Sequence, residues 1–184
     1  MDWLRAGQGR REFERFVTDW TDHLLRTGYL MAWDLAEAED LVQETLLRVA
    51  RRWNRVRSMD HPHSYARRIL VNLAIDSAER RARHRGELGA PRLAEHKDKR
   101  AERELGAVDT QAELLAALAR LPVRQRAVIV LRYWEDLPEA EVAVILGCSR
   151  GTVKSTASRG LVRLREALSA GQSEHPVTGT PAPR

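Results

Sequence analysis

The sequence predicts an all-α protein of two small helical domains joined by a flexible linker, the second a helix-turn-helix domain. Apolar residues recur at three- and four-residue spacing over most of the chain, a charged stretch of low apolar content interrupts them, and a Gly-Cys-Ser break separates two later helical segments. The chain has 184 residues, of which 43% are hydrophobic, enough to form the cores of two such domains.

The first domain is expected to span residues 1–85 and to contain three helices. Helical spacing of apolar residues predicts them from about Arg10 to Leu30, from Asp34 to Trp53 and from His63 to about Arg83. Expected core positions of the first helix are Phe13, Phe16, Val17, Trp20, Leu24 and Leu25.

The second of these helices has a distinctive outward side. Its predicted buried stripe consists of Leu35, Ala38, Val42, Leu46, Val49 and Trp53, which leaves Asp40, Gln43, Glu44, Leu47 and Arg51 on the opposite side. Acids precede bases along the helix, and complementarity to the helix dipole explains that order. It does not explain Leu47, an exposed apolar residue among charges. Two interpretations stay open on this pattern: an isolated exposed leucine, or a surface for a partner helix.

The third helix carries a polar line that includes Arg68, Asn72 and Asp76, while Val71 and Ile75 indicate that a second side is covered as well. Such a helix could contact phosphates through its arginines and bases through the Asn72 amide. A solvated polar face is the other interpretation, and the pattern alone favours it.

Residues 86–107 are predicted to be the linker. They include Gly89, Pro91 and the run EHKDKRAERE, whose charges nearly balance. A tether of this kind would let the two domains dock at separate places on one partner. The tail, 171–184, has the composition of a disordered segment.

The second domain is expected over residues 108–170. Pro122 suits the first turn of a helix in which Val123, Ala127, Val130, Leu131 and Trp134 recur at helical spacing. Pro138 begins a shorter helix that ends at Gly147, a residue able to adopt the left-handed conformation that helix ends require. Ser149 is the expected N-cap of the third helix.

The third helix of this domain is predicted to bind DNA. Its buried stripe consists of Val153, Ala157, Gly160, Leu161, Leu164 and Leu168, and Thr152, Ser155 and Arg159 point away from it. Lys154 lies on the flank, and Arg150 would reach DNA only from the helix tip. Residues 150–166 include five basic residues and one acidic residue, whereas residues 135–141 include four acidic residues and no basic one. A helix face that is merely solvated would carry charges of both signs, so this separation favours DNA binding.

The composition narrows the partners and functions. A net charge of +5 and a pI near 10.0 favour a polyanion such as nucleic acid. No apolar run spans a bilayer and no signal-peptide core is present, so a cytoplasmic protein without membrane insertion is expected. The one cysteine, Cys148, is expected to pack rather than to sense redox state. His61 and His63 lack further ligands, so neither metal nor cofactor is expected, and no motif indicates an enzyme.

Two longer segments resemble a known family. They are similar to the extracytoplasmic-function (ECF) sigma factors of the bacterial sigma-70 class. The first is EAEDLVQETLLRVARRW followed by SYARRILVNLAIDSAERR, and the second, after a linker, is LPVRQRAVIVLRYWEDLPEAEVAVILGCSRGTVKSTASRGLVRLR. The likeness covers nearly all of 13–168. The motifs DLVQE and GTVKS stand in the family's order and separation.

The resemblance implies a function and residue roles. Such a protein binds core RNA polymerase, recognises bipartite promoters and initiates transcription, without catalysis of its own. The β′ clamp would dock on Asp40, Gln43, Glu44, Leu47 and Arg51. The minus-ten element would be read by Arg68, Asn72 and Asp76, and the loop 54–64 would form the pocket for a flipped base. The second domain would dock on the β flap and place Arg150, Thr152, Lys154, Ser155 and Arg159 at the minus-thirty-five element.

Some positions depart from the family pattern. Thr156 stands where many relatives have arginine, and the segment YLMAWDLAEAED lacks the Gly-Asp turn often found before the acidic helix. The loop 54–64 has no aromatic wedge, so strand opening is expected to rely on capture of specific bases and promoters to be stringent. A stand-alone helix-turn-helix regulator is the alternative function; a protein-binding scaffold or anti-regulator and an unrecognised enzyme are others. The promoter, the inducing signal, the oligomeric state and the existence of an anti-sigma partner stay open.

Overall fold

The computed structural model describes residues 7–87 and 109–173, and these residues form helices and no β-strand. The all-α prediction is therefore confirmed for this part of the chain. Most of the expected linker 86–107 and of the expected tail 171–184 lies outside the described residues.

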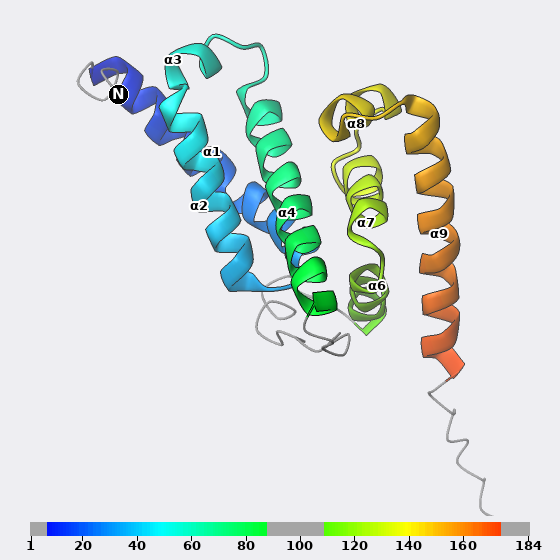
Figure 1. Ribbon diagram of the computed structural model, residues 1–184. Coiled ribbons are helices and arrows are strands. Elements are labelled where there is room, and N and C mark those ends of the chain that lie inside the picture. The colour runs from blue at the N-terminus through cyan, green and yellow to red at the C-terminus, as the bar shows by residue number, and fades with distance from the viewer. Residues whose placement is uncertain (1–6, 88–108, 174–184) are drawn as a thin grey trace, which may run out of the picture.

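The helices form two halves that lie side by side (Figure 1). In chain order, the first half consists of α1 (Gly7–Ala32), α2 (Leu35–Arg51), the single turn α3 (Trp53–Val56) and α4 (Pro62–Glu87). The second half consists of α6 (Asp109–Ala119), α7 (Val123–Ile129), the π-helix η2 (Val130–Trp134), α8 (Glu139–Leu146) and α9 (Arg150–Ser173).

Trp33 and Asp34 form the turn that precedes α2, where the sequence lacks the Gly-Asp of the family pattern. Trp33 adopts a left-handed backbone with φ of 60°, which is unusual for a bulky residue. Its ring lies 5.4 Å from that of Tyr29, a contact that supports this conformation. Asp34 then caps α2, since its carboxylate accepts a hydrogen bond from Glu37 N at 2.8 Å.

The helix-turn-helix forms as the sequence predicts. Gly147 has φ 62° and ψ 37°, the left-handed conformation that ends α8. Ser149 caps α9, because its Oγ accepts a hydrogen bond from Thr152 N at 3.0 Å. Val153 and Ala157 are buried against the rest of the domain, and Cys148 is partly buried against the core, in agreement with a packing role.

The helix expected from Pro122 to Trp134 changes its period near its end. In η2 the Glu135 N–H donates to Val130 O at 3.0 Å, five residues back instead of four. The wider turn rotates the following side chains. Trp134, predicted on the buried face, is 46% exposed, whereas the Glu135 side chain is only 2% exposed. The prediction for Trp134 was wrong because it extended the α-helical period through a π-turn.

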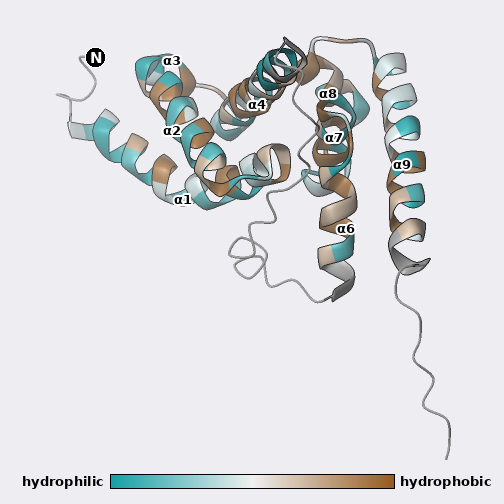
Figure 2. Cartoon of the chain, turned by 60° about the horizontal axis from the view of Figure 1, so that its bottom comes forward, coloured by the Kyte–Doolittle hydropathy of each residue, from teal (hydrophilic) through white to brown (hydrophobic). Residues whose placement is uncertain are grey.

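One apolar core runs through both halves of the molecule. Helix α4 packs on α1 and α2 in its own half and on α7 and α8 in the other. Val71 and Ile75, the residues that indicated a second covered side, are both buried. Figure 2 shows hydrophobic residues dominating α7, a helix inside this arrangement, and hydrophilic residues recurring along α9. The two halves thus share one packed interior.

Close packing of α9 on α7 yields a stability test. A Cβ on Gly160 would lie 3.1 Å from Ile129 Cγ1, whereas a Cβ on Gly151 of the same helix would meet nothing nearer than Ser149 Oγ at 3.7 Å. We expect Gly160→Val to lower the free energy of unfolding by about 1–3 kcal/mol through overpacking. Urea unfolding followed by circular dichroism measures it. Gly151→Val is the matched control, and an equal loss in both variants would contradict this packing.

Candidate nucleic-acid interface

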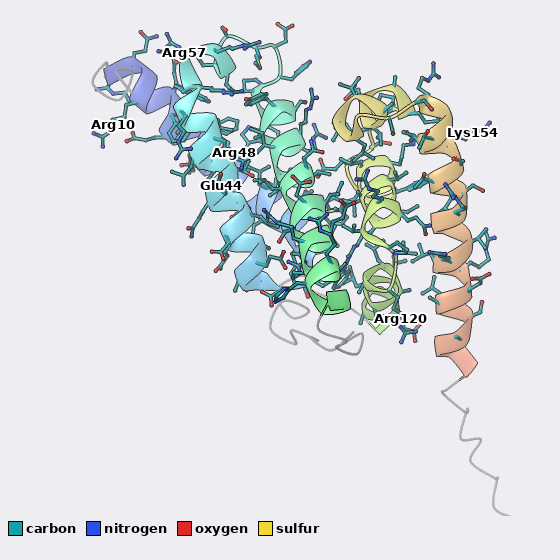
Figure 3. The ribbon with its side chains drawn as sticks, viewed as in Figure 1. Arg10, Glu44, Arg48, Arg57, Arg120 and Lys154 are labelled. Atoms are coloured by element: carbon teal, nitrogen blue, oxygen red, sulfur yellow. The ribbon has the colours of Figure 1, made fainter. Side chains whose placement is uncertain are left out.

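The N-terminal turns of α9 present a polar surface to solvent. All five predicted DNA-binding residues on this helix are exposed: Arg150, Thr152, Lys154, Ser155 and Arg159. The Ser155 hydroxyl donates to Thr152 O at 3.1 Å, and Arg159 Nε donates to Ser155 O at 3.3 Å. Lys154 extends away from the rest of the molecule (Figure 3). Basic side chains at the start of an exposed helix suit a DNA groove.

The predicted minus-ten readers on α4 have different surroundings. Arg68 and Asp76 are exposed, but Asn72 is only partly exposed, because its Nδ2 donates to Ile145 O of α8 at 3.2 Å and to Arg68 O at 2.9 Å. The amide that would read a base is therefore engaged by the other half of the chain.

The acidic side of α2 lies away from α9 (Figure 3). Asp40, Gln43 and Arg51 are exposed, Glu44 is partly exposed and bonds to Arg48 at 2.7 Å, and Leu47 is 50% exposed. The predicted exposure of this leucine among charges is thus confirmed.

An open cleft of about 440 Å³ borders this side of α2, and Asp40 and Glu44 form part of its lining. Across it, Glu37 of α2 accepts hydrogen bonds from Ser77 Oγ at 2.9 Å and from Arg81 of α4. These bonds tie the acidic helix to α4 and hold its outward face in place.

An aromatic stack at the end of the segment 54–64, where α4 has already begun at Pro62, was not expected from the sequence. The Trp20 ring of α1 stacks on His63 with centroids 4.2 Å apart and planes 7° from parallel. Burial, and then the nearby Arg67, lowers the pKa of His63. The imidazole is thereby kept neutral, which suits a stack. Since Trp20 lies some forty residues before the loop, inspection of the loop alone could not find it.

A buried carboxylate joins the two halves. Glu135 accepts hydrogen bonds from Thr27 Oγ1 at 2.5 Å, His23 Nε2 at 2.9 Å and Arg67 Nη1 at 2.9 Å. The partners belong to α1 and α4, whereas Glu135 follows η2. We call these four residues the Glu135 clasp. The side chains of Arg67 and Glu135 are 9% and 2% exposed, so the pair is almost dry. In the sequence, Glu135 is only one member of an acidic stretch, and nothing near it indicates this contact with the first half.

Arg126 of α7 is a buried cation, and no carboxylate among the described residues forms an ion pair with it. Its Nε has no hydrogen-bond partner among the described residues, and the residue is 9% exposed. Burial, followed by repulsion from Arg81 of α4, lowers its pKa to about 10.

Within residues 7–87 and 109–173 there is no group of three or more His, Cys, Asp or Glu side chains that could hold a metal ion. Over the same ranges, no helix is long and apolar enough to cross a membrane.

Two family models match the chain. Residues 12–84 match sigma-70 region 2, and residues 111–164 match sigma-70, region 4. Both matches fall on the surfaces described above: α2 and α4 in the first, the helix-turn-helix in the second.

Curated relatives and solved structures agree with these models. The RNA polymerase sigma-E factor of Streptomyces antibioticus is 38% identical over 157 residues, covering 85% of this chain and 84% of the relative. The ECF RNA polymerase sigma factor SigL of Mycobacterium tuberculosis H37Rv is 32% identical over 146 residues, covering 79% and 82%. The sigma factor RpoE of Bartonella quintana, solved in complex with the anti-sigma factor NepR, has a TM-score of 0.65 at 27% identity, covering 86% of this chain and 98% of that one.

The buried Arg126 provides a stability test of the site. A cation whose pKa falls on folding costs stability in full below its folded pKa of about 10, and the cost is relieved only as pH rises above that value. We expect Arg126→Met, which removes the charge but keeps the chain length, to raise the free energy of unfolding at pH 7 by about 1 kcal/mol or more.

Urea midpoints at pH 7 and pH 9 measure this effect, which should be equal at both. Arg124→Met, a change at an exposed arginine of the same helix, is the control. A lower midpoint for Arg126→Met than for the unsubstituted chain would contradict an uncompensated charge.

Proposed function

Because this chain belongs to the ECF sigma factors of the sigma-70 family and acts as an RNA polymerase sigma factor, we propose which of its surfaces carries each part of that function. Core RNA polymerase and promoter DNA are its partners. The observation that carries the assignment is the separation of two outward faces: an acidic one with a central leucine on α2, and a basic one on α9.

The α2 face is the proposed site for the β′ clamp. It consists of Asp40, Gln43, Glu44, Leu47 and Arg51. A half-exposed leucine supplies apolar area that a partner can bury, and the surrounding charges supply orientation and specificity. Leu47 has no role in the core, which favours a contact over a structural role.

The start of α9 is the proposed reader of the minus-thirty-five element. Thr152, Ser155 and Arg159 would face base edges in the major groove, with Lys154 on the flank and Arg150 at the tip. This half would also dock on the β flap.

Helix α4 and the loop 54–64 are the proposed minus-ten site. Arg68, Asn72 and Asp76 would read bases, and the loop would receive a flipped base, which must offset a few kcal/mol of lost stacking. His63 lies within this segment, and its stack with Trp20 could add an aromatic surface for an unstacked base. Such a surface would be a departure from the expectation that the site has no aromatic contribution.

The proposed domain limits are 1–85 and 108–170, with 86–107 as the linker and 171–184 as a tail. Phosphodiester chemistry would belong to the polymerase, so the chain would supply specificity and no catalysis, and it would act in the cytoplasm, where its DNA and polymerase are. An anti-sigma protein, such as the one bound to the Bartonella relative, is a further proposed partner.

Reconstituted transcription tests the proposal. Core polymerase loaded with this chain should start RNA at defined genomic positions, and mapping the 5′ ends gives both promoter elements. A stand-alone helix-turn-helix regulator would instead bind duplex tightly without polymerase, and an enzyme would turn over a substrate with neither polymerase nor DNA present. Failure to associate with core polymerase would overturn the assignment.

The α2 face can be tested by truncation of its leucine. We expect Leu47→Ala to weaken binding to core polymerase by about tenfold, because apolar contact area is lost at the centre of the proposed interface. Titration of labelled chain with core polymerase measures it. Val162→Ala on α9, where the valine is 47% exposed, is the matched control. Equal losses in both variants would place the interface elsewhere.

The α9 face can be tested independently. Arg159→Ala should weaken use of promoters through the minus-thirty-five element by about 1–3 kcal/mol and leave polymerase binding unchanged. Promoter titrations with the holoenzyme measure it. Arg165→Ala, which removes the same charge further along α9 and on its other flank, should have a smaller effect. Loss of polymerase binding in Arg159→Ala would contradict the division of roles.

A further inference from the structure

Four aromatic rings form a continuous column where α1 meets the start of α4. The centroid of the His61 ring lies 5.7 Å from that of His63, and His63 stacks on Trp20 at 4.2 Å. Trp20 in turn lies edge-on to His23 at 5.7 Å, and His23 bonds to Glu135 at 2.9 Å. His61 is exposed, whereas the other three rings are partly buried. The column is therefore anchored at its inner end and reaches solvent at its outer end.

The outer end of this column is available to a further ring. Within the described residues, the imidazoles of His61 and His63 make no hydrogen bond, so the exposed His61 can turn aside without the loss of one. His63 is kept neutral, because burial and then Arg67 lower its pKa. A neutral ring is less strongly hydrated than a cation and costs less to cover. A flat base can therefore stack on the outer side of His63.

A basic surface flanks the column. Residues 52–64 hold three arginines and one acidic residue. Arg57 is paired with a carboxylate of α1 at 2.9 Å, whereas Arg52 and Arg55 are exposed and form no ion pair within the described residues. Arg52 instead donates to Tyr65 Oη at 3.2 Å, a bond that holds it beside the first turn of α4. Guanidinium groups that have no carboxylate partner are suited to backbone phosphates.

The rings and the arginines lie at the same end of the first half, where α3 leads into α4 (Figure 1). Proteins that bind single strands combine these two features: cationic groups follow the phosphates, and aromatic rings stack on successive bases. In duplex DNA the bases are stacked inside, so only a base that has left its pair can reach the column. The combination therefore selects an unpaired strand over a duplex.

We infer that this end of the chain is a single-strand DNA site of low sequence preference, in which an unpaired base stacks on the His61–His63 end of the column while neighbouring phosphates contact Arg52 and Arg55. The inference rests on the proposed function for the source of the strand, a promoter opened at the minus-ten element. Stacking requires no particular donor or acceptor, because every base has a π face. Strand opening then depends on more than the capture of specific bases, which is all that the loop sequence led us to expect.

The site is separate from the proposed minus-ten readers. Arg68, Asn72 and Asp76 follow it along α4 and would recognise bases by hydrogen bonds, which depend on base identity. The column would hold a base by its face, whatever its identity. Sequence reading and strand holding are thereby assigned to different turns of one helix.

Binding of single strands to the free, full-length chain tests the inference. The probes are a labelled oligodeoxythymidylate of about twelve nucleotides and an abasic strand of equal length, which keeps the phosphates and lacks the bases. Fluorescence anisotropy should show that the native chain binds the first about tenfold more tightly, at the lower end of what one stacked base contributes. Equal affinities would overturn the inference. Oligodeoxycytidylate should bind within a few-fold of oligodeoxythymidylate, and a preference above about tenfold would overturn the low sequence preference.

Variants of His63 separate stacking from a structural role. His63→Ala should bind the two probes equally, because the outer ring is lost, and His63→Phe should restore the preference for the strand with bases. His84→Ala, which removes an exposed histidine near the other end of α4, should keep that preference. Any loss of folded protein weakens both probes alike and leaves their ratio unchanged. A preference that persists in His63→Ala, disappears in His84→Ala or does not return in His63→Phe would overturn the inference.

Variants of Arg55 test the phosphate contact. Arg55→Gln should weaken both probes, keep their ratio and reduce the slope of log affinity against log salt by about 0.7, the value for one phosphate contact to a single strand. Arg83→Gln, at an exposed arginine far along α4, is the matched control and should leave the slope unchanged. Equal slopes for Arg55→Gln and the native chain would overturn this contact. The proposed function fails separately, if the native chain binds single strands but directs no specific transcripts with core polymerase.

Discussion

The burial of one carboxylate determines how the two halves of this sigma factor sit together. Glu135 follows the π-turn 130–134, and its side chain lies against the first half. There it is almost completely withdrawn from water and is held by His23, Thr27 and Arg67. A buried carboxylate is tolerated only where donors surround it, so this contact permits very few relative positions of the halves.

The outward faces of α2 and α9 stay exposed because the residues of the Glu135 clasp lie on the sides where the two halves face each other. The acidic side of α2 and the start of α9 lie on different sides of the molecule, and neither takes part in the contact between halves (Figure 3). The proposed minus-ten surface differs, because Asn72 lies at the contact itself. The same arrangement thus leaves the proposed polymerase face exposed, while Asn72 of the proposed minus-ten surface is bonded to the other half.

Local rules of helix formation made much of this structure predictable. Gly147 and Ser149 depend only on residues near them in sequence, and the structure agrees at both. In the predicted apolar stripe of α9, Val153, Ala157 and Gly160 are buried, whereas Leu161, Leu164 and Leu168 are only partly buried. The exposure of Leu47 also followed from helical periodicity. The roles proposed for these faces came from the family resemblance and not from periodicity.

What the sequence could not predict depends on distant residues or on a change of period. Trp134 is exposed where the α-helical period predicts burial, because a single wide turn is not visible in apolar spacing, and nothing in the sequence indicated the burial of Glu135. The Trp20–His63 stack and the clasp join segments far apart in the chain. Val71 and Ile75 did indicate that α4 is covered on a second side, but periodicity cannot identify the element that covers it.

The most direct test of the central claim is the distance between the two halves of the free chain, measured by pulsed electron resonance on paired spin labels. The native chain should give a single short distance, because the buried Glu135 permits very few relative positions of the halves. A long or broadly distributed distance in the native chain would contradict the claim.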